Sequence, residues 1–177
     1  MQTATMHENT VHLPVVDSRV GKYLSFYVGP EEFAIAVLGV REIMGMQDIT
    51  AVPHTPVYVK GIINLRGKVV PVVDLRLKFG MTIAEKTVNT CVIIVEVEME
   101  GEKVVMGAMA DAVQEVLDLE PDQIEPPPRI GTKLNTDFIR GMGKHADQFI
   151  IILDIDKVFT IDELELVHEP NLVATNG

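Results

Sequence analysis

The residue types that most often carry catalysis are present in this chain, but their spacing forms no known catalytic or metal-binding motif. No two of the five histidines are separated by one or three residues, and the single cysteine, Cys91, has no histidine nearby in the sequence. A metal site is therefore not predicted. The sequence also lacks a G-x-S-x-G motif, a Walker-type phosphate loop and a GxGxxG loop between a strand and a helix. We therefore expect no cofactor and do not predict an enzyme.

Composition and charge exclude several other classes of protein. The chain has 177 residues, 47% of them hydrophobic, and a formal net charge of −11. A protein that binds the phosphate backbone needs the opposite charge, so nucleic acid is not an expected partner. No apolar run approaches the ~20 residues that span a bilayer, and the polar N-terminus has no signal-peptide core. A lone cysteine fits a reducing compartment, so we expect a cytoplasmic protein without direct membrane insertion.

Charge is distributed unevenly along the chain. Residues 60–86 contain six Lys or Arg and two acidic residues, whereas residues 96–125 contain ten acidic residues and one Lys. Each segment could simply solvate its part of the surface. Alternatively, oppositely charged faces could steer different partners and set their docking orientation.

Short apolar runs separated by glycine-marked turns predict a mainly β fold. The expected strands cover residues 23–28, 33–37, 61–65, 69–75, 91–97, 104–110 and 149–155. Pro71 cannot donate a ladder hydrogen bond, so its strand is expected at a sheet edge or at a bulge. A capping box at Thr160–Glu163 predicts a short helix over 161–167, and residues 1–20 and 169–177 are expected to be flexible tails. Many short strands of this kind are typical of small barrels or of a sandwich.

An internal repeat organises these elements. Residues 59–79 align without gaps with residues 139–159, and upstream residues 40–43 match residues 113–116. We therefore predict a single domain over residues 21–168, made of two related units at about 21–86 and 87–160, each with about five strands. Units of this size bury too little surface to be stable alone, so the two are expected to pack together and to leave a groove between them.

A candidate binding ridge lies at Val40–Ile43, which has apolar ends and a polar middle and precedes two methionines. Methionine recurs at protein-binding surfaces, although packing at the end of a strand would explain the same pattern. Glu42 and Arg66 have opposite charges and lie in adjacent loops of the first unit. We expect them to form an ion pair that holds the ridge in place.

At these residues the chain resembles the CheW-type coupling proteins of bacterial chemotaxis. The resemblance is carried by residues 40–43, 59–67, 70–76, 110–117, 124–128 and 138–143, and it extends over about 21–167. It implies two SH3-like five-stranded β-barrel subdomains with short helices, and a non-enzymatic adaptor of two-component signal transduction. It also implies two partners, namely the cytoplasmic tip of a methyl-accepting chemotaxis receptor and the regulatory domain of the histidine kinase CheA. The protein would then be recruited to membrane-associated receptor arrays.

The resemblance further implies two binding surfaces. The receptor-binding groove is expected to include Val40, Glu42, Ile43, Gly61, Asn64, Leu65 and Arg66. Apolar anchors framed by charges suit the recognition of a helical hairpin. The kinase-binding surface is expected to include Glu125 and Ile130, which flank three consecutive prolines.

Two alternatives remain open from the sequence. The first is a coupling protein of a paralogous signalling pathway. The second is a small-ligand-binding or hydrolytic β-barrel that uses carboxylates in the groove between the units. Two converging, desolvated carboxylates would favour the second alternative, whereas an apolar groove rimmed by charges would favour the adaptor.

Overall fold

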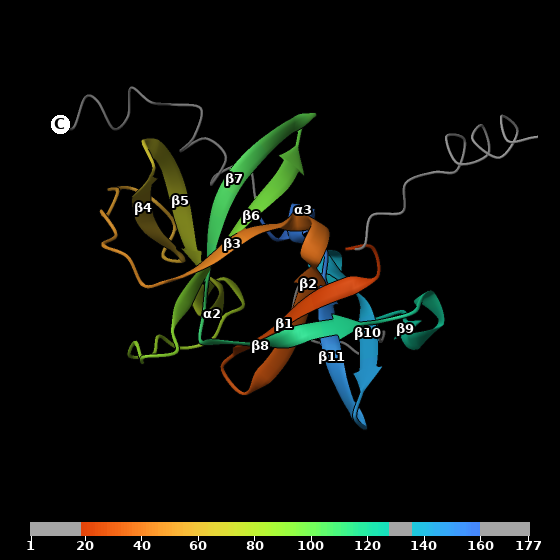
Figure 1. Ribbon diagram of the computed structural model, residues 1–177. Helices are drawn as coiled ribbons and strands as arrows, with labels where there is room; N and C mark the ends of the chain where they lie inside the picture. The colour runs from red at the N-terminus through yellow and green to blue at the C-terminus, as the bar shows by residue number, and fades with distance from the viewer. Residues whose placement is uncertain (1–18, 128–135, 160–177) are drawn as a thin grey trace, which may run out of the picture.

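The computed structural model describes residues 19–127 and 136–159, which form two β-sheets with several short helices (Figure 1). One sheet has five strands in the order β3-β6-β7-β5-β4, and the other has six in the order β8-β1-β2-β11-β10-β9. The five-stranded sheet consists of β3 (Val40–Gly45), β4 (Val59–Leu65), β5 (Lys68–Asp74), β6 (Cys91–Met99) and β7 (Glu102–Ala110). The six-stranded sheet consists of β1 (Lys22–Val28), β2 (Glu31–Ala36), β8 (Ala112–Asp118), β9 (Ile124–Glu125), β10 (Ile139–His145) and β11 (Gln148–Leu153). The short helices are η1 (Val37–Gly39), α2 (Leu75–Lys78), η2 (Pro121–Gln123), η3 (Thr136–Phe138) and α3 (Ile155–Val158).

The predicted mainly β character is confirmed, and each predicted strand overlaps an observed one. Strands β8, β9 and β10 were not predicted, and β3 was considered only as a ridge at the end of a strand. The helix predicted over 161–167 and both predicted tails, apart from residues 19 and 20, lie outside the described residues. Within residues 19–127 and 136–159, no helix has the length and apolar character needed to cross a membrane.

The sheets do not follow the predicted division of the chain near residue 86. Strands β1 and β2 pair with strands from the C-terminal part of the chain: β1 lies antiparallel to β8, and β2 lies parallel to β11. Strands β6 and β7, which belong to the second predicted unit, instead pair with β3 and β5. The predicted boundary therefore differs from the sheet membership, because sequence order alone does not determine which non-local strands share a ladder.

The two sheets nevertheless repeat the same arrangement. The order β3-β6-β7-β5-β4 matches β8-β1-β2-β11-β10 strand for strand. The β4–β5 and β10–β11 hairpins each contain a register shift next to the aligned glycine, Gly61 or Gly141. After each hairpin an aligned aspartate caps a one-turn helix: Asp74 accepts from the Arg76 N–H at 2.9 Å, and Asp154 accepts from the Asp156 N–H at 3.2 Å. The N-terminal strands thus complete the second copy of the repeat.

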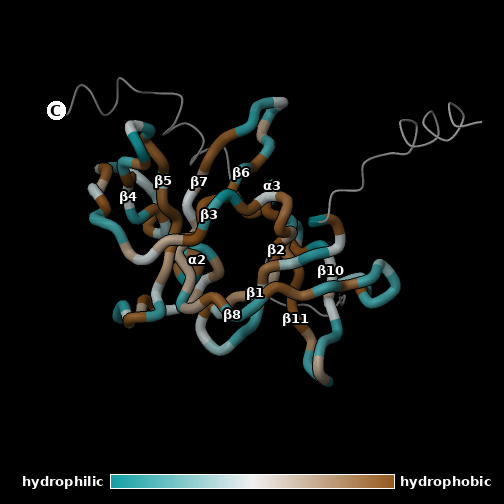
Figure 2. The backbone as a smooth tube through the Cα atoms, in the orientation of Figure 1, coloured by the Kyte–Doolittle hydropathy of each residue, from teal (hydrophilic) through white to brown (hydrophobic). Residues whose placement is uncertain are grey.

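The largest hydrophobic core lies between the two sheets and takes side chains from both. Four phenylalanine rings run through it, with centroid separations of 6.2 Å from Phe26 to Phe33, 5.0 Å from Phe33 to Phe79 and 5.2 Å from Phe79 to Phe138. Hydrophobic stretches of β5, β7 and β11 appear brown in Figure 2. Two smaller clusters belong to single sheets, one around Val70 and Ile94 and the other around Leu117 and Ile150.

Pro71 does not occupy the position predicted for it. Strand β5 lies between β4 and β7, and the register shift of its hairpin is at Lys60, so the prediction of an edge or a bulge at Pro71 is wrong. Pro71 is instead paired with Ile62, and the parallel ladder with β7 starts one residue later, at Val72 and Gly107. Proline has no N–H to give to a ladder, and the β5–β7 ladder covers only residues that follow it.

Candidate functional site

The β4–β5 hairpin holds Arg66 at its tip. Its two-residue loop places Arg66 at φ 51° and Gly67 at φ 88°. Positive φ at both positions is the signature of a type I′ turn, whose twist matches that of the flanking strands. The Asn64 side chain accepts a hydrogen bond of 2.8 Å from the Gly67 N–H, which fixes the turn from inside. The Arg66 side chain remains 71% exposed.

Arg66 donates a hydrogen bond to the Glu42 carboxylate, so the expected ion pair is present. Glu42 lies in β3 and Arg66 follows β4, which are the two outer strands of the five-stranded sheet. The pair therefore links the two outer strands of this sheet. The hydrogen bond from Arg66, together with attraction to Arg66 and Arg41, lowers the pKa of Glu42 despite the opposing effect of desolvation.

A groove of about 150 Å³ lies beside this ion pair. It is lined by Arg41, Glu42, Leu65, Arg66, Lys68, Val70, Ile94 and Val105. Val70 and Ile94 belong to the small core cluster of this sheet, and Leu65 and Val105 pack against it. The floor is therefore apolar and the rim is charged, which is the arrangement expected of an adaptor.

The structure separates the predicted receptor-binding residues between two faces of β3. A register shift at Arg41 pairs Val40 with Val95 but pairs Glu42 with Ile94. Val95 belongs to the core between the sheets and Ile94 to the cluster under the groove, so Val40 and Glu42 point in opposite directions. A bulge has this effect because it changes the usual alternation of side chains along a strand.

Ile43, which is paired with Ile93, follows the face of Val40 and is 45% exposed. The exposed amide of Asn64 holds the turn. Gly61 adds no side chain to the groove, since it is buried and a Cβ there would lie 2.1 Å from the Thr50 carbonyl oxygen. It lets the Thr50 backbone exchange hydrogen bonds of 2.9 and 2.8 Å with Ile62. Of the predicted residues, therefore, Glu42, Leu65 and Arg66 line the groove, and the others support it or lie beside it.

The predicted kinase-binding residues are described only in part. Glu125 lies in β9, the outer strand of the six-stranded sheet, where it is exposed and paired with Met142. Ile130 lies outside the described residues.

Sequence reasoning missed four residues that line the groove, namely Lys68, Val70, Ile94 and Val105, and it included Arg41 only as part of the Val40–Ile43 ridge. Val70 and Ile94 were assigned only to strands, because their runs are apolar on both faces. Alternation along β5 places Lys68 and Val70 on one face, and this signal could have identified Lys68 once Val70 was known to face the small cluster.

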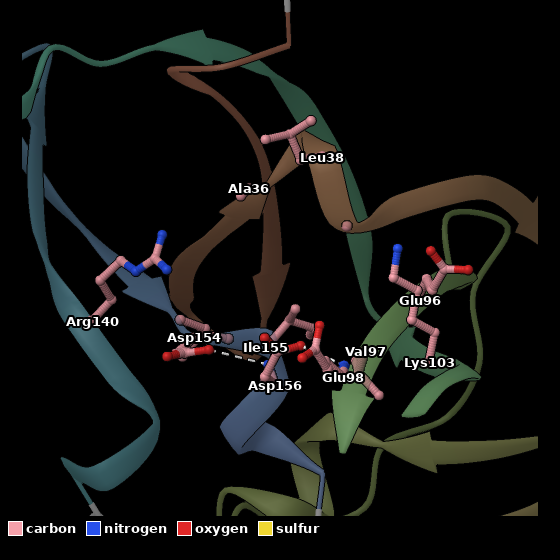
Figure 3. A pocket seen from close by; sticks show the side chains of 12 residues that line it. Ala36, Leu38, Glu96, Val97, Glu98, Lys103, Arg140, Asp154, Ile155 and Asp156 are labelled. Atoms are coloured by element: carbon pink, nitrogen blue, oxygen red, sulfur yellow. Dashed lines mark hydrogen bonds between the residues drawn. The ribbon is translucent and has the colours of Figure 1, made fainter. Parts of the chain in front are cut away.

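A second hollow of about 320 Å³ lies between the sheets, with Arg140 on one side, Glu96 and Lys103 opposite, and α3 on its floor (Figure 3). Three of its four carboxylates, those of Glu96, Asp154 and Asp156, make hydrogen bonds or an ion pair with other groups of the protein. Asp154 and Asp156 accept backbone hydrogen bonds from Asp156 and Glu98, respectively, and Glu96 pairs with Arg41 at 2.7 Å. This use of the carboxylates does not support the hydrolytic alternative. No cluster of three or more His, Cys, Asp or Glu suited to a metal ion occurs among the residues that the structure describes.

The fold and the groove define a mainly β protein that is built to bind another protein. Residues 22–163 match the CheW-like domain family. The chain is 38% identical over 146 residues to the chemotaxis protein CheW of Klebsiella aerogenes, covering 82% of this chain and 86% of that protein. It is 37% identical over 142 residues to the chemotaxis protein CheW of Rhizobium meliloti, covering 80% and 89%, respectively.

A solved structure points the same way. The crystal structure of the scaffolding protein TtCheW from Thermoanaerobacter tengcongensis matches with a TM-score of 0.71 and 36% sequence identity, covering 81% of this chain and 94% of that one. The chain belongs to the CheW-like family. The predicted class, a chemotaxis coupling protein and not an enzyme, is therefore confirmed, and the ligand-binding or hydrolytic alternative is not favoured.

Proposed function

We propose that this protein couples chemoreceptors to the histidine kinase CheA, and that the groove beside Glu42 and Arg66 binds the receptor tip. Membership of the CheW-like family supports a coupling role. The observation that carries the location is the apolar floor under an ion pair at an exposed hairpin tip. Coupling to a receptor array would place the protein in the cytoplasm, at the membrane-associated receptors.

The groove suits a helical hairpin because its apolar and charged parts are separated. An apolar side chain of the receptor helix would rest on Leu65, Ile94 and Val105, as in other helix-in-groove complexes. Arg66 would orient Glu42 or contact a receptor carboxylate. Ile43 would extend the contact around β3, with Val40 packed behind it, while Asn64 and Gly61 would hold the hairpin and strand in position.

The kinase would bind a separate surface, which includes Glu125 and Ile130. We also propose that each sheet closes into an SH3-like five-stranded barrel around its own small cluster. The Glu42–Arg66 pair, which joins the outer strands of the first sheet, supports this closure. Residues 21–168 would form the single domain, with the chain ends as tails and a short helix at 161–167. Because β1 and β2 pair with C-terminal strands, we assign the two barrels by sheet and not by the division near residue 86.

A reconstituted kinase assay tests the proposal. The protein is mixed with CheA and with receptor cytoplasmic fragments from the same genome in membrane-mimicking arrays, and kinase autophosphorylation is followed. We expect stimulation that requires all three components and is lost in the Arg66→Glu variant. Lys144→Glu is the matched control, because Lys144 lies in the equivalent β10–β11 hairpin and is exposed. Circular dichroism checks that both variants fold.

Three outcomes separate the parts of the proposal. Full receptor binding by a folded Arg66→Glu variant would remove Arg66 from the receptor site. A lack of stimulation with every receptor would point to a paralogous pathway. A Glu125→Arg variant should lose affinity for CheA and keep its affinity for receptors, and unchanged CheA binding would remove Glu125 from the kinase surface.

A further inference from the structure

The internal repeat gives each residue of the groove an equivalent position in the six-stranded sheet, and the residue types at the two sets of positions differ. In the five-stranded sheet Glu42 is paired with Ile94, and in the other sheet the aligned Glu115 is paired with Ser25. The buried Ser25 hydroxyl makes two hydrogen bonds with the Glu115 backbone. It donates to the Glu115 carbonyl oxygen at 3.2 Å and accepts from the Glu115 N–H at 3.3 Å. The apolar Ile94 on the floor of the groove thus corresponds to the small polar Ser25 in the six-stranded sheet.

The rims differ in the same direction. The offset of 80 aligns Lys68 with Gln148. In the parallel ladders, Gly107 lies opposite Val72 in one sheet and Ala34 lies opposite Ile152 in the other. Since Val72 and Ile152 are aligned by the repeat, Gly107 corresponds to Ala34. Two residues earlier, Val105 therefore corresponds to Glu32. The groove is apolar and has cations on its rim, whereas the equivalent positions of Ile94, Val105 and Lys68 hold Ser25, Glu32 and Gln148 and are more polar.

The groove beside Glu42 and Arg66 also continues into a neighbouring space, which is separate from the hollow between the two sheets. A space of about 590 Å³ lies between the N-terminal parts of β5 and β7, lined by residues 68–70 and 102–105. It shares Lys68, Val70 and Val105 with the groove. The two strands are not yet paired here, because their ladder begins at Val72 and Gly107. The continuous surface is long enough to receive more than one side chain of a partner, and Val69, which is 46% exposed, adds apolar area.

Lys68 is the cation that lines both the groove and the neighbouring space and has no acidic residue opposite it in its ladder. Arg66 is bonded to Glu42, and Arg41 lies 2.7 Å from Glu96. Lys103 lies opposite the acidic Glu98 in the β6–β7 ladder, although no ion pair joins the two among the residues that the structure describes. Lys68 lies opposite the apolar Leu65 in the β4–β5 ladder. It makes no ion pair with an acidic residue among those that the structure describes.

We propose that the segment bound in this groove is an acidic amphipathic helix of the receptor, which places an apolar side chain over Ile94 and Val105 and a carboxylate against Lys68. The inference rests on the proposed receptor-binding function and adds the chemistry of the partner to it. Charge complementarity selects this occupant: the surface combines exposed or half-buried valines with a lysine that makes no ion pair among the described residues, and the adjoining space is lined by two lysines and one glutamate, Glu102, on a protein whose net charge is −11. The equivalent position in the other sheet, Gln148, provides no charge for such a carboxylate.

Binding of a receptor cytoplasmic fragment to the full chain tests this proposal. We expect Lys68→Glu to weaken binding about tenfold and to reduce its dependence on salt, since rim charges act on association and are screened by ions. Lys68→Gln should weaken binding less. Lys144→Glu, with the same change of charge on the equivalent hairpin, should bind as the unmodified protein does. One acid-to-lysine substitution in the receptor tip should restore binding of the Lys68→Glu variant.

The outcomes distinguish this proposal from the one on which it rests. If the unmodified protein binds the receptor fragment and Lys68→Glu binds it equally well, the acidic partner is overturned and the receptor groove stands. If Lys144→Glu weakens binding as much as Lys68→Glu does, the effect is one of net charge and the assignment to Lys68 is wrong. If the unmodified protein binds no receptor fragment, both proposals fail together.

Discussion

His145 approaches Glu115 in the six-stranded sheet, with 3.8 Å between Nε2 and Oε2, and this contact repeats the relationship between Arg66 and Glu42 in the other sheet. In both sheets the acid lies in an outer strand and its partner at the far hairpin. The second pair carries an attraction between opposite charges only when His145 is protonated, whereas an arginine is always charged. Only the first sheet therefore keeps its two outer strands joined by a permanent ion pair.

The Glu42 carboxyl should titrate below its usual range, mainly because of the hydrogen bond from Arg66, and the Arg66→Gln variant should raise the pKa of Glu42 toward its ordinary value. Arg41→Gln should raise the pKa less, because Arg41 acts on Glu42 only by attraction. Carbon-detected NMR titration measures both shifts. A depressed pKa stabilises the folded state above the ordinary pKa of glutamate, and this contribution is lost as the pH falls through the folded value. An unchanged pKa of Glu42 in Arg66→Gln would contradict the pair.

Gly61→Ala should destabilise the protein by about 2–4 kcal/mol, because overpacking combines with an unfavourable backbone angle. A Cβ at Gly61 would lie 2.1 Å from the Thr50 carbonyl oxygen, and its φ is 143°. Gly141→Ala, whose Cβ would lie 2.6 Å from the Glu125 carbonyl oxygen, should cost about 1–3 kcal/mol. Gly67→Ala is the control: it has open space but a positive φ, so about 1–2 kcal/mol is expected. Urea unfolding measures all three, and a Gly61→Ala variant no less stable than Gly67→Ala would contradict the contact with Thr50.

Asp74→Asn should be at least as stable as the unmodified protein at pH 7, whereas Asp74→Ala should lose about 1 kcal/mol. Burial raises the pKa of Asp74, although its hydrogen bond from the Arg76 N–H opposes the shift. Stability from a raised carboxyl pKa is present below the unfolded value and is lost as the pH rises through the folded value. Asparagine keeps the cap without the buried charge. Urea unfolding at pH 4 and pH 7 tests this, and a less stable Asp74→Asn at pH 7 would contradict it.

Asp111→Ala should destabilise the protein by about 2–3 kcal/mol, since it removes two hydrogen bonds that involve a charged group. The Asp111 carboxylate accepts from Arg76 Nε at 2.9 Å and from the Gly29 N–H at 2.6 Å. It thereby connects α2, which follows β5 of the five-stranded sheet, to the turn between β1 and β2 of the other sheet. Arg76→Ala leaves the bond to Gly29 in place, so it should cost less than Asp111→Ala. Thermal unfolding of the two variants measures the difference, and equal losses would show that the bond to Gly29 contributes nothing.

The sequence by itself indicated seven of the strands, the duplication, the ion pair and the class of protein. Alternating apolar runs identify strands because side chains of a strand point to opposite faces in turn. The repeat aligns Gly61 with Gly141 and Asp74 with Asp154, and the structure shows that each glycine lies close to a backbone carbonyl and each aspartate caps a helix. Strands and turns are local, so a single segment contains the information needed to predict them, and the duplication follows from comparing two segments of the same sequence.

Only the tertiary structure decided which strands share a sheet and which side chains share a groove. Strands β1 and β2 join the C-terminal strands, because ladder hydrogen bonds form between segments far apart in the chain. The register shift at Arg41 sends Val40 and Glu42 to opposite faces, although they are two residues apart. Ile94 and Val105 reach the groove through strands that carry no motif. Register, bulges and non-local pairing thus assemble this site, and a shift of one residue in register changes the face of every side chain that follows.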